Sequence, residues 1–280
     1  MLGEATVCKM LSPQLLAMPP RLEKWQARSP MPYQELLPHP ALRPFVDRLW
    51  MRTSSGGEEA VRILPDGCID VLVSGQDAFV VGTMTRAFVL PEGTPMRTVA
   101  VRFRPGGATP FLRAPAHELT DHRVDCKDLG ARWLACGALL DADELTVSLR
   151  LLERALLDQL PRVDAPNPLV AHAVRVLNAS MEPSITQLAR SLGFTRQHLS
   201  REFRAHVGVS PKELSMVMRM QRAVACIQRG HTTLAAVAAH AGYFDEAHMD
   251  RDFRQLVGAT PKAALASGSI RPILSLFDAP

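Results

Sequence analysis

The stretch SITQLARSLGFTRQHLSREFRAHVGVSPK at residues 184–212 is repeated as TLAAVAAHAGYFDEAHMDRDFRQLVGATPK at residues 233–262. The two copies align at an offset of 49 residues up to Tyr243 and of 50 residues further on, so the second copy has one extra residue in the turn that follows Gly242. An insertion is tolerated in a turn, whereas inside a helix it would rotate one face away from the core. The repeat therefore predicts two copies of one structural unit, each with a turn at the shared glycine.

Each copy follows the pattern of a helix, a glycine turn and a second helix. In the first copy Ser184 and Thr195 are suitable N-caps for two successive helices, because their hydroxyls can accept hydrogen bonds from free backbone amides. Gly193 lies between them and can adopt the left-handed conformation that lets the chain turn sharply. Leu199 and Phe203 are four residues apart, so they share the buried face of the second helix. The pattern predicts a helix-turn-helix unit.

The second copy repeats these features and is joined to the first by a long helix. Asp245 caps its outer helix, on which Met249 and Phe253 form the buried face. Between the copies, the sequence SPKE at residues 210–213 is a capping box with proline in the first turn, and it begins a helix that ends near Arg229. We expect this connecting helix to set the separation of the two units.

The outward faces of the two outer helices are polar and carry arginine. A helix with such a face fits the major groove of DNA, where base edges offer hydrogen-bond donors and acceptors. One alternative is a repeat of two helical hairpins that binds nothing, and another is a module that binds only other proteins. The second of these would not need Arg201 and Arg251 at matching outward positions. The residues predicted to face DNA are Arg196, Gln197, Ser200, Arg201 and Arg204 in the first copy, and Glu246, Ala247, Asp250, Arg251 and Arg254 in the second.

Positive charge is concentrated in the same part of the chain. Residues 165–280 contain 13 Lys and Arg against 8 Asp and Glu, whereas the rest of the chain contains 19 against 20. A basic domain favours a polyanionic partner, of which nucleic acid is the usual one.

The repeat region resembles the DNA-binding domain of the AraC family of transcriptional regulators over about 100 of the 280 residues. The resemblance implies two recognition helices in successive major-groove segments of double-stranded DNA, with Gln197, Ser200 and Arg201 reading bases in the first unit. In the second unit the corresponding residues, Glu246, Ala247, Asp250 and Arg251, are partly acidic, which departs from the usual pattern. RNA polymerase and a second copy of the chain are further candidate partners. The stretches that carry the resemblance are residues 242–244 (GYF), 247–249 (AHM), 251–254 (RDFR) and 257–261 (VGATP).

The half of the chain that precedes the repeat has the pattern of a small β domain. Short β-type runs separated by turn signals predict an antiparallel sheet or small barrel with flanking helices. After them, leucines at three- and four-residue steps predict a helix within residues 141–160. The expected strands are Val61–Leu64, Ile69–Val73, Phe79–Val81, Phe88–Leu90 and Thr98–Phe103.

The fold class predicted for the whole chain is α+β, with the helix-turn-helix part all-α. We expect a poorly ordered extension at residues 1–35, where five prolines and no clear period occur. A β-rich sensor or regulatory domain follows at 36–125 and a helical linker segment at 126–162. The double helix-turn-helix domain covers 163–266 and ends in a tail at 267–280.

Charged residues on the expected strands are candidates for binding an effector. Asp70, Arg102 and Arg104 could hold an anionic small molecule, although an ion pair between Asp70 and the arginines fits the sequence equally well. The N-terminal half also resembles a domain found on some AraC-type regulators, which implies a sensor or dimerisation module. We therefore predict a small-molecule effector at this domain.

Several classes of protein are disfavoured by the sequence. It contains none of the G-x-S-x-G, H-E-x-x-H, P-loop or dinucleotide-binding motifs, so we predict no catalytic residues and no cofactor. The alternative is a DNA-modifying or small-molecule enzyme that uses the repeat only for docking. The five cysteines form no C-x-x-C pair, which predicts reduced thiols and no metal site. No apolar run is long enough to cross a membrane, and we expect a cytoplasmic protein.

Overall fold

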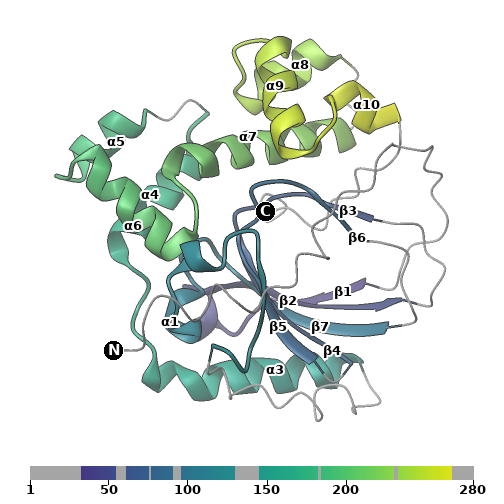
Figure 1. The fold of residues 1–280 in the computed structure, drawn as a ribbon, viewed down its shortest axis with the longest axis vertical. Helices are drawn as coiled ribbons and strands as arrows, with labels where there is room; N and C mark the ends of the chain where they lie inside the picture. Colours follow the sequence, from purple (N-terminus) through teal and green to yellow (C-terminus); the bar gives the residue numbers. More distant parts are fainter. Residues whose placement is uncertain are drawn as a thin grey trace.

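The computed structural model describes residues 33–54, 61–75, 77–90, 96–129, 145–181, 184–229 and 233–266. An antiparallel sheet lies between one helix, α3, and a layer of helices that begins at α4 (Figure 1). The predicted α+β class is confirmed. Most of the predicted extension, the predicted tail, Cys8 and Cys136 lie outside the described residues.

The main sheet has six strands in the order β1-β2-β7-β4-β5-β8, and every neighbouring pair is antiparallel. Two further strands, β3 and β6, pair separately. All five predicted strands are present, but β1, β2 and β8 were not predicted, and β1 begins inside the predicted extension. The strands are β1 (Tyr33–Leu36), β2 (Val46–Ser54), β3 (Val61–Ile63), β4 (Ile69–Ser74), β5 (Asp77–Val81), β6 (Phe88–Leu90), β7 (Met96–Phe103) and β8 (Arg123–Asp125).

One face of the sheet is covered by α3 (Leu145–Gln159), the helix predicted from the leucine spacing. Leu149, Leu152 and Leu156 are buried in one hydrophobic core with strand residues such as Val71 and Val101. Although this helix falls in the segment predicted as a linker, it packs against β2 and β7 as part of the β domain. Short helical turns complete the domain, namely η3 (Pro40–Leu42), α1 (Thr109–Leu112), η4 (Ala116–Glu118) and η5 (Leu160–Arg162).

The helical layer contains both predicted helix-turn-helix units. Ser184, Thr195 and Asp245 accept hydrogen bonds from backbone amides of the helices they were predicted to cap, and the capping box at residues 210–213 is complete. Gly193 has the predicted positive φ, of 77°. The helices are α4 (Pro168–Ala179), α5 (Ile185–Ser191), α6 (Arg196–Val207), α7 (Pro211–Gln228), α8 (Leu234–Ala241), α9 (Glu246–Leu256) and α10 (Pro261–Ala266).

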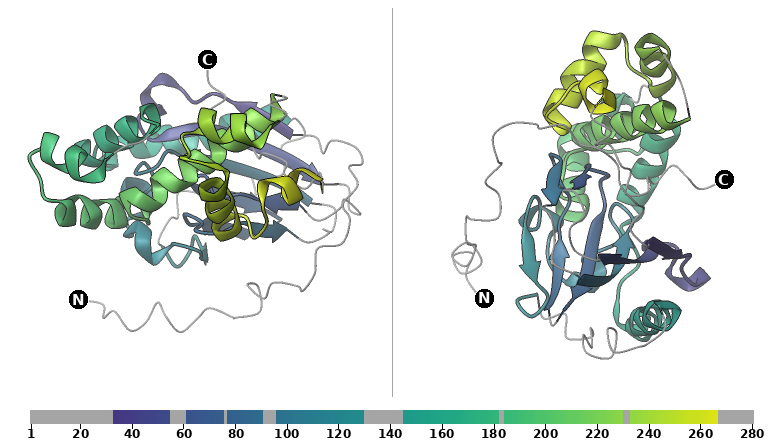
Figure 2. Two further views of the ribbon diagram at one scale, coloured as in Figure 1. Left: turned by 90° about the horizontal axis from the view of Figure 1, so that it is seen from above. Right: turned by 90° about the vertical axis from the view of Figure 1, so that its right-hand side faces the viewer.

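The connecting helix α7 runs from the first unit to the second, and it lies between the second unit and the sheet (Figures 1 and 2). Leu214 and Met218 of α7 pack in the core of the first unit, around Phe203. Other residues of α7 pack in the core of the second unit, around Phe253, and that core also contains Leu64 of the β domain. Each unit therefore has its own core, and α7 belongs to both.

Candidate nucleic-acid interface

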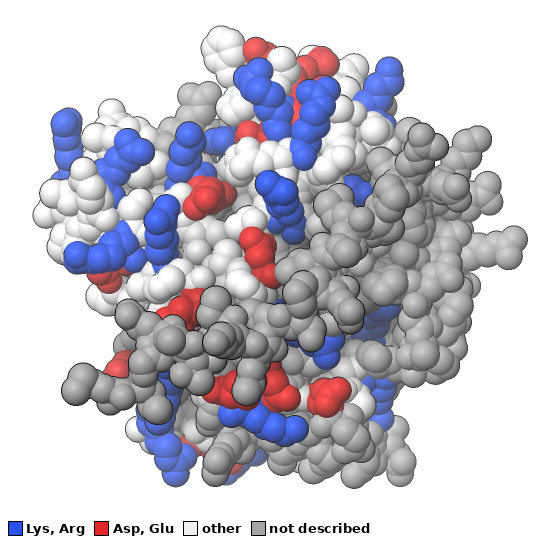
Figure 3. Space-filling view, viewed as in Figure 1, with Lys and Arg blue, Asp and Glu red and all other residues white. Residues whose placement is uncertain are grey.

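The structure places the predicted recognition faces of α6 and α9 outward. Leu199 and Phe203 of α6 and Met249 and Phe253 of α9 have no exposed surface, which confirms the predicted buried faces. On the opposite faces every predicted residue is exposed except Ser200 and Asp250, which are half-buried. The face shown in Figure 3 has Lys and Arg side chains gathered over the helical layer.

Arg201 of the first unit is oriented by its neighbours. Its side chain is 72% exposed, and its Nη2 lies 2.8 Å from His198 Nδ1. The His198 ring stacks on Phe194, with ring centroids 4.7 Å apart. In the second unit the equivalent residues, His248 and Tyr243, also contact each other, edge to face at 5.2 Å. This aromatic–histidine pair is not among the sequence predictions, although its recurrence in the repeat is a signal for it.

The acidic residues of the second unit have different local roles. Asp250 forms an ion pair with Arg254 at 3.3 Å, which leaves the exposed Arg251 outside that pair. Asp252 is buried and pairs with Arg219 of α7 at 3.1 Å, so it faces the core of the unit and not the groove side. With Asp245 acting as the N-cap, only Glu246 and the partly neutralised Asp250 present acidic charge on the recognition face.

A single arginine of α7 contacts both units. Arg222 donates to the carbonyls of Leu177 and Ser180 at the end of α4, and to the carbonyl of Ala241 at the end of α8. The last carbonyls of a helix lack partners within the helix, so a guanidinium with several donors can satisfy two helix ends at once. Burial lowers the pKa of Arg222, but an arginine remains protonated at any physiological pH.

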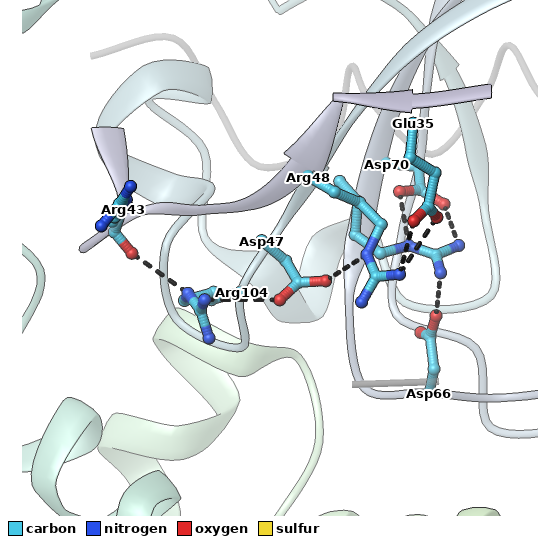
Figure 4. A network of polar contacts seen from close by, with 8 residues as sticks. Glu35, Arg43, Asp47, Arg48, Asp66, Asp70 and Arg104 are labelled. Carbon is cyan, nitrogen blue, oxygen red and sulfur yellow. Dashed lines mark hydrogen bonds and ion pairs between the residues drawn. The ribbon is translucent and has the colours of Figure 1, made fainter. Parts of the chain in front are cut away.

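The three candidate effector residues separate into two groups. Arg102 is buried and pairs with Asp70 at 2.9 Å and with Asp66 at 3.2 Å. Burial alone would lower the pKa of the Arg102 guanidinium, but the two carboxylates raise it well above its usual value. Arg104 instead pairs with Asp47 at 3.5 Å, beside the same network (Figure 4).

Three cysteines lie within the described residues. Cys68, Cys126 and Cys226 are free and buried, and burial raises the pKa of the Cys68 thiol well above its usual value. No three His, Cys, Asp or Glu side chains gather within the described ranges in a way that could hold a metal ion. None of the described helices combines the length and apolar character needed to cross a lipid bilayer.

Two family models match the chain, one in each half. Residues 34–125 match a family described as "Domain of unknown function (DUF6597)". Residues 188–267 match a family described as "Helix-turn-helix domain". The second match covers most of both units described above, including α6, α7 and α9.

Three similar proteins cover different shares of the chain. The "Lactose operon transcription activator" of Staphylococcus xylosus is 33% identical over 86 residues, which are 30% of this chain and 31% of that protein. Among solved structures, the C-terminal domain of AraT, a response regulator from Geobacillus stearothermophilus, is 19% identical with a TM-score of 0.35 and covers 39% of this chain and 93% of its own. ToxT from Vibrio cholerae is 8% identical with a TM-score of 0.45 and covers 78% and 98%.

The sequence matches and the geometry agree on the C-terminal half. Two helix-turn-helix units share a connecting helix, and their outer helices expose arginine at the same position of the repeat. Residues 188–267 therefore form a helix-turn-helix region with two units, and they follow a domain at residues 34–125 whose family is described as having unknown function.

Proposed function

We propose that this protein is a sequence-specific DNA-binding regulator of transcription that inserts α6 and α9 into successive segments of the major groove. The observation that carries the proposal is the pair of equivalent recognition helices, each with an exposed arginine, Arg201 or Arg251, above a fully buried aromatic residue. A rigid helix with a polar face is the element that reads base edges in the major groove. The regulation of transcription by the similar activator of S. xylosus supports the same function here.

The roles of individual residues follow from their position and chemistry. Arg201 and Arg251 are the candidates for bidentate contact with guanine, while Arg196, Arg204 and Arg254 are suited to phosphates. Arg201 is held by His198, so less conformational entropy is lost when it binds. Glu246 lies in the first turn of α9 and can accept a hydrogen bond from the amino group of a cytosine or an adenine in the groove.

The proposal is tested by selecting bound duplexes from a random double-stranded DNA library. The full-length protein should enrich a two-part site, and Arg201→Ala combined with Arg251→Ala should abolish the enrichment. Arg154→Ala is the matched control, because its side chain on α3 is 75% exposed and lies far from the recognition helices in the fold. Enrichment that is equal for the double variant and the control would contradict the proposal.

An effector at the N-terminal domain is the second part of the proposal. An anionic ligand would contact Arg104, which is 47% exposed, whereas Arg102 is already paired with two carboxylates. Changing Arg104 to alanine should then remove the response to an inducer while the affinity for DNA without inducer is retained. Dimerisation and contact with RNA polymerase remain predictions, which light scattering and transcription in a purified system would test.

A further inference from the structure

The β domain donates hydrogen bonds to the C-terminal end of the first recognition helix. The last carbonyls of α6 have no partner within the helix. Thr83 Oγ1 donates to the carbonyl of Val207, the last residue of α6, at 2.5 Å. Thr120 Oγ1 donates to the carbonyl of Gly208 at 2.9 Å. A Cβ on Gly208 would lie 2.6 Å from Thr120 Oγ1, so the two domains are in close contact here.

The same domain also donates to the end of the second recognition helix. Arg62 Nη1 donates to the carbonyl of Val257 at 2.5 Å, and the backbone amide of Ala87 donates to the carbonyl of Leu256 at 2.6 Å. Val207 and Val257 are the same position of the repeat, fifty residues apart. The β domain therefore binds the equivalent carbonyl at the end of each recognition helix.

The segment Thr83–Ala87 contacts both helices, one at each of its ends. It is itself fixed to the β domain, because the Asp121 carboxylate accepts from the Thr85 amide at 2.7 Å and from the Thr85 hydroxyl at 2.6 Å. The Asp121 amide in turn donates to the Thr83 carbonyl at 3.0 Å. A short, internally bonded segment of this kind has little freedom to change the distance between its two contacts.

We propose that the segment Thr83–Ala87, together with Arg62, fixes the separation and orientation of α6 and α9, and so selects the spacing of the two DNA half-sites; this inference rests on the proposed function. The connecting helix α7 joins the units along the chain, and the segment joins their recognition helices through space. Because one extra base pair rotates the second half-site by about 35° around the duplex, a fixed pair of helices accepts only one spacing.

The first test measures the geometry without DNA. Spin labels at Gln197→Cys on α6 and Ala247→Cys on α9, with Cys8 and Cys136 replaced by serine, report the distance between the recognition helices. Thr83→Val and Arg62→Met each remove one side-chain donor and preserve most of the side-chain volume. The distance distribution should broaden in each variant and most in the double variant. An unchanged distribution in the double variant would overturn the inference, because the side-chain bonds of Thr83 and Arg62 would then not set the separation.

The control for this measurement is Ser74→Ala. Ser74 is buried, and its hydroxyl bonds within the sheet, to Thr98 and to the Arg97 carbonyl, so its loss leaves both helix contacts in place. Its distance distribution should match that of the unmodified protein. Circular dichroism melts of all variants identify any that fail to fold, and for those Thr83→Ala and Arg62→Leu, which also remove the donor, provide the comparison.

The second test measures spacing selectivity with unlabelled proteins. The probe is the two-part duplex enriched by the full-length protein and the same duplex with one base pair inserted between its halves. The unmodified protein should bind the inserted duplex at least about tenfold more weakly, and Thr83→Val with Arg62→Met should reduce that ratio to about threefold or less. An unchanged ratio in the double variant would overturn the inference. If the full-length protein enriches no duplex, the proposed function fails, whereas the spin-label result still decides whether the segment fixes the helices.

Discussion

The two helix-turn-helix units have the same pattern of helices, but their recognition helices are held in place differently. The acidic residue that follows the outward arginine is Glu202 in α6 and Asp252 in α9. Glu202 is partly exposed and bonds to the side chain of Asn167 at 3.1 Å. Asp252 is buried and pairs with Arg219, which also lies 5.5 Å from the centre of the Tyr243 ring. A repeat can therefore keep an acidic position while its energetic role changes from a surface contact to a buried ion pair.

The two units also differ in charge, which affects how each would hold DNA. Residues 165–230 contain 9 Lys and Arg against 3 Asp and Glu, whereas residues 231–280 contain 4 against 5. Attraction to phosphates supplies most of the non-specific affinity for DNA. We expect the first unit and α7 to provide most of this attraction, and the second unit to contribute mainly to selectivity.

The largest expected difference between the units is in stability. Asp252→Ala leaves the largely buried guanidinium of Arg219, whose side chain is 17% exposed, without its carboxylate, and it should lower the free energy of unfolding by about 2–3 kcal/mol. Glu202→Ala removes only a partly exposed contact and should cost less than about 1 kcal/mol. Urea unfolding of both variants measures the difference. Equal losses would mean that the burial of the acidic residue does not distinguish the units.

The next largest effect concerns DNA affinity. Arg201→Ala should cost about 1–3 kcal/mol of binding free energy if its guanine contact is bidentate. Arg251→Ala should cost less, because the second unit contributes less phosphate attraction, and it should mainly relax the preference at one half of the site. Fluorescence anisotropy titrations at several salt concentrations separate the two variants. A greater loss for Arg251→Ala, with an equally large change in salt dependence, would reverse the expected division between the units.

A third comparison uses pH. Burial raises the pKa of the Tyr243 hydroxyl above its usual value, whereas Phe194 at the equivalent position of the first unit cannot ionise. Above about pH 10 the unfolded chain loses this proton while the folded chain keeps it, so the free energy of unfolding should fall by up to about 1.4 kcal/mol per pH unit. Tyr243→Phe, which copies the first unit, should flatten this part of the stability profile. Urea unfolding across the alkaline range would show parallel profiles if Tyr243 were not responsible.

The smallest expected effect comes from the ion pair on the recognition face of α9. Asp250→Asn releases Arg254 to contact a phosphate, and it removes one repelling charge. Non-specific affinity should rise about two- to threefold, with a salt dependence that is steeper by up to about 0.9. Glu118→Gln is the matched control, because it removes an exposed carboxylate from the β domain. Equal increases for the two variants would indicate a general charge effect and not a local one.

The parts of the fold that could be predicted from the sequence depend on contacts between residues close in the chain. Caps such as Ser184 and Asp245 and the four-residue spacing of Leu199 and Phe203 are local signals, and the structure confirms them. Strand β2 could not be found in this way. Its Asp47 and Arg48 are buried as an ion pair at 2.7 Å. These polar residues interrupt the apolar pattern from which strands were predicted, although the strand lies inside the domain.

The sequence predicts which residues of the candidate site point outward, but not which residues hold the two recognition helices in place. Helical spacing fixes which residues of α6 and α9 point outward, whatever the rest of the molecule does. The residues that hold those helices, such as Thr83 and Arg222, make contacts with residues far away in the sequence or on another helix. Likewise the leucine spacing predicted α3, but a periodic apolar face does not specify which surface will cover it.

One side chain of the β domain, Leu64, lies in the hydrophobic core of the second helix-turn-helix unit, whereas the first unit's core is built from the helical half alone. In evolutionary terms, the two units therefore differ in whether each could be transferred to another protein with its core intact. The first unit could be exchanged between proteins with its core complete. The second unit, transferred without the β domain, would have a cavity the size of a leucine side chain in its core. Creating such a cavity in a packed core lowers the free energy of unfolding by about 2–5 kcal/mol. Inheritance of the β domain and the second unit as one piece is the arrangement that avoids this cost.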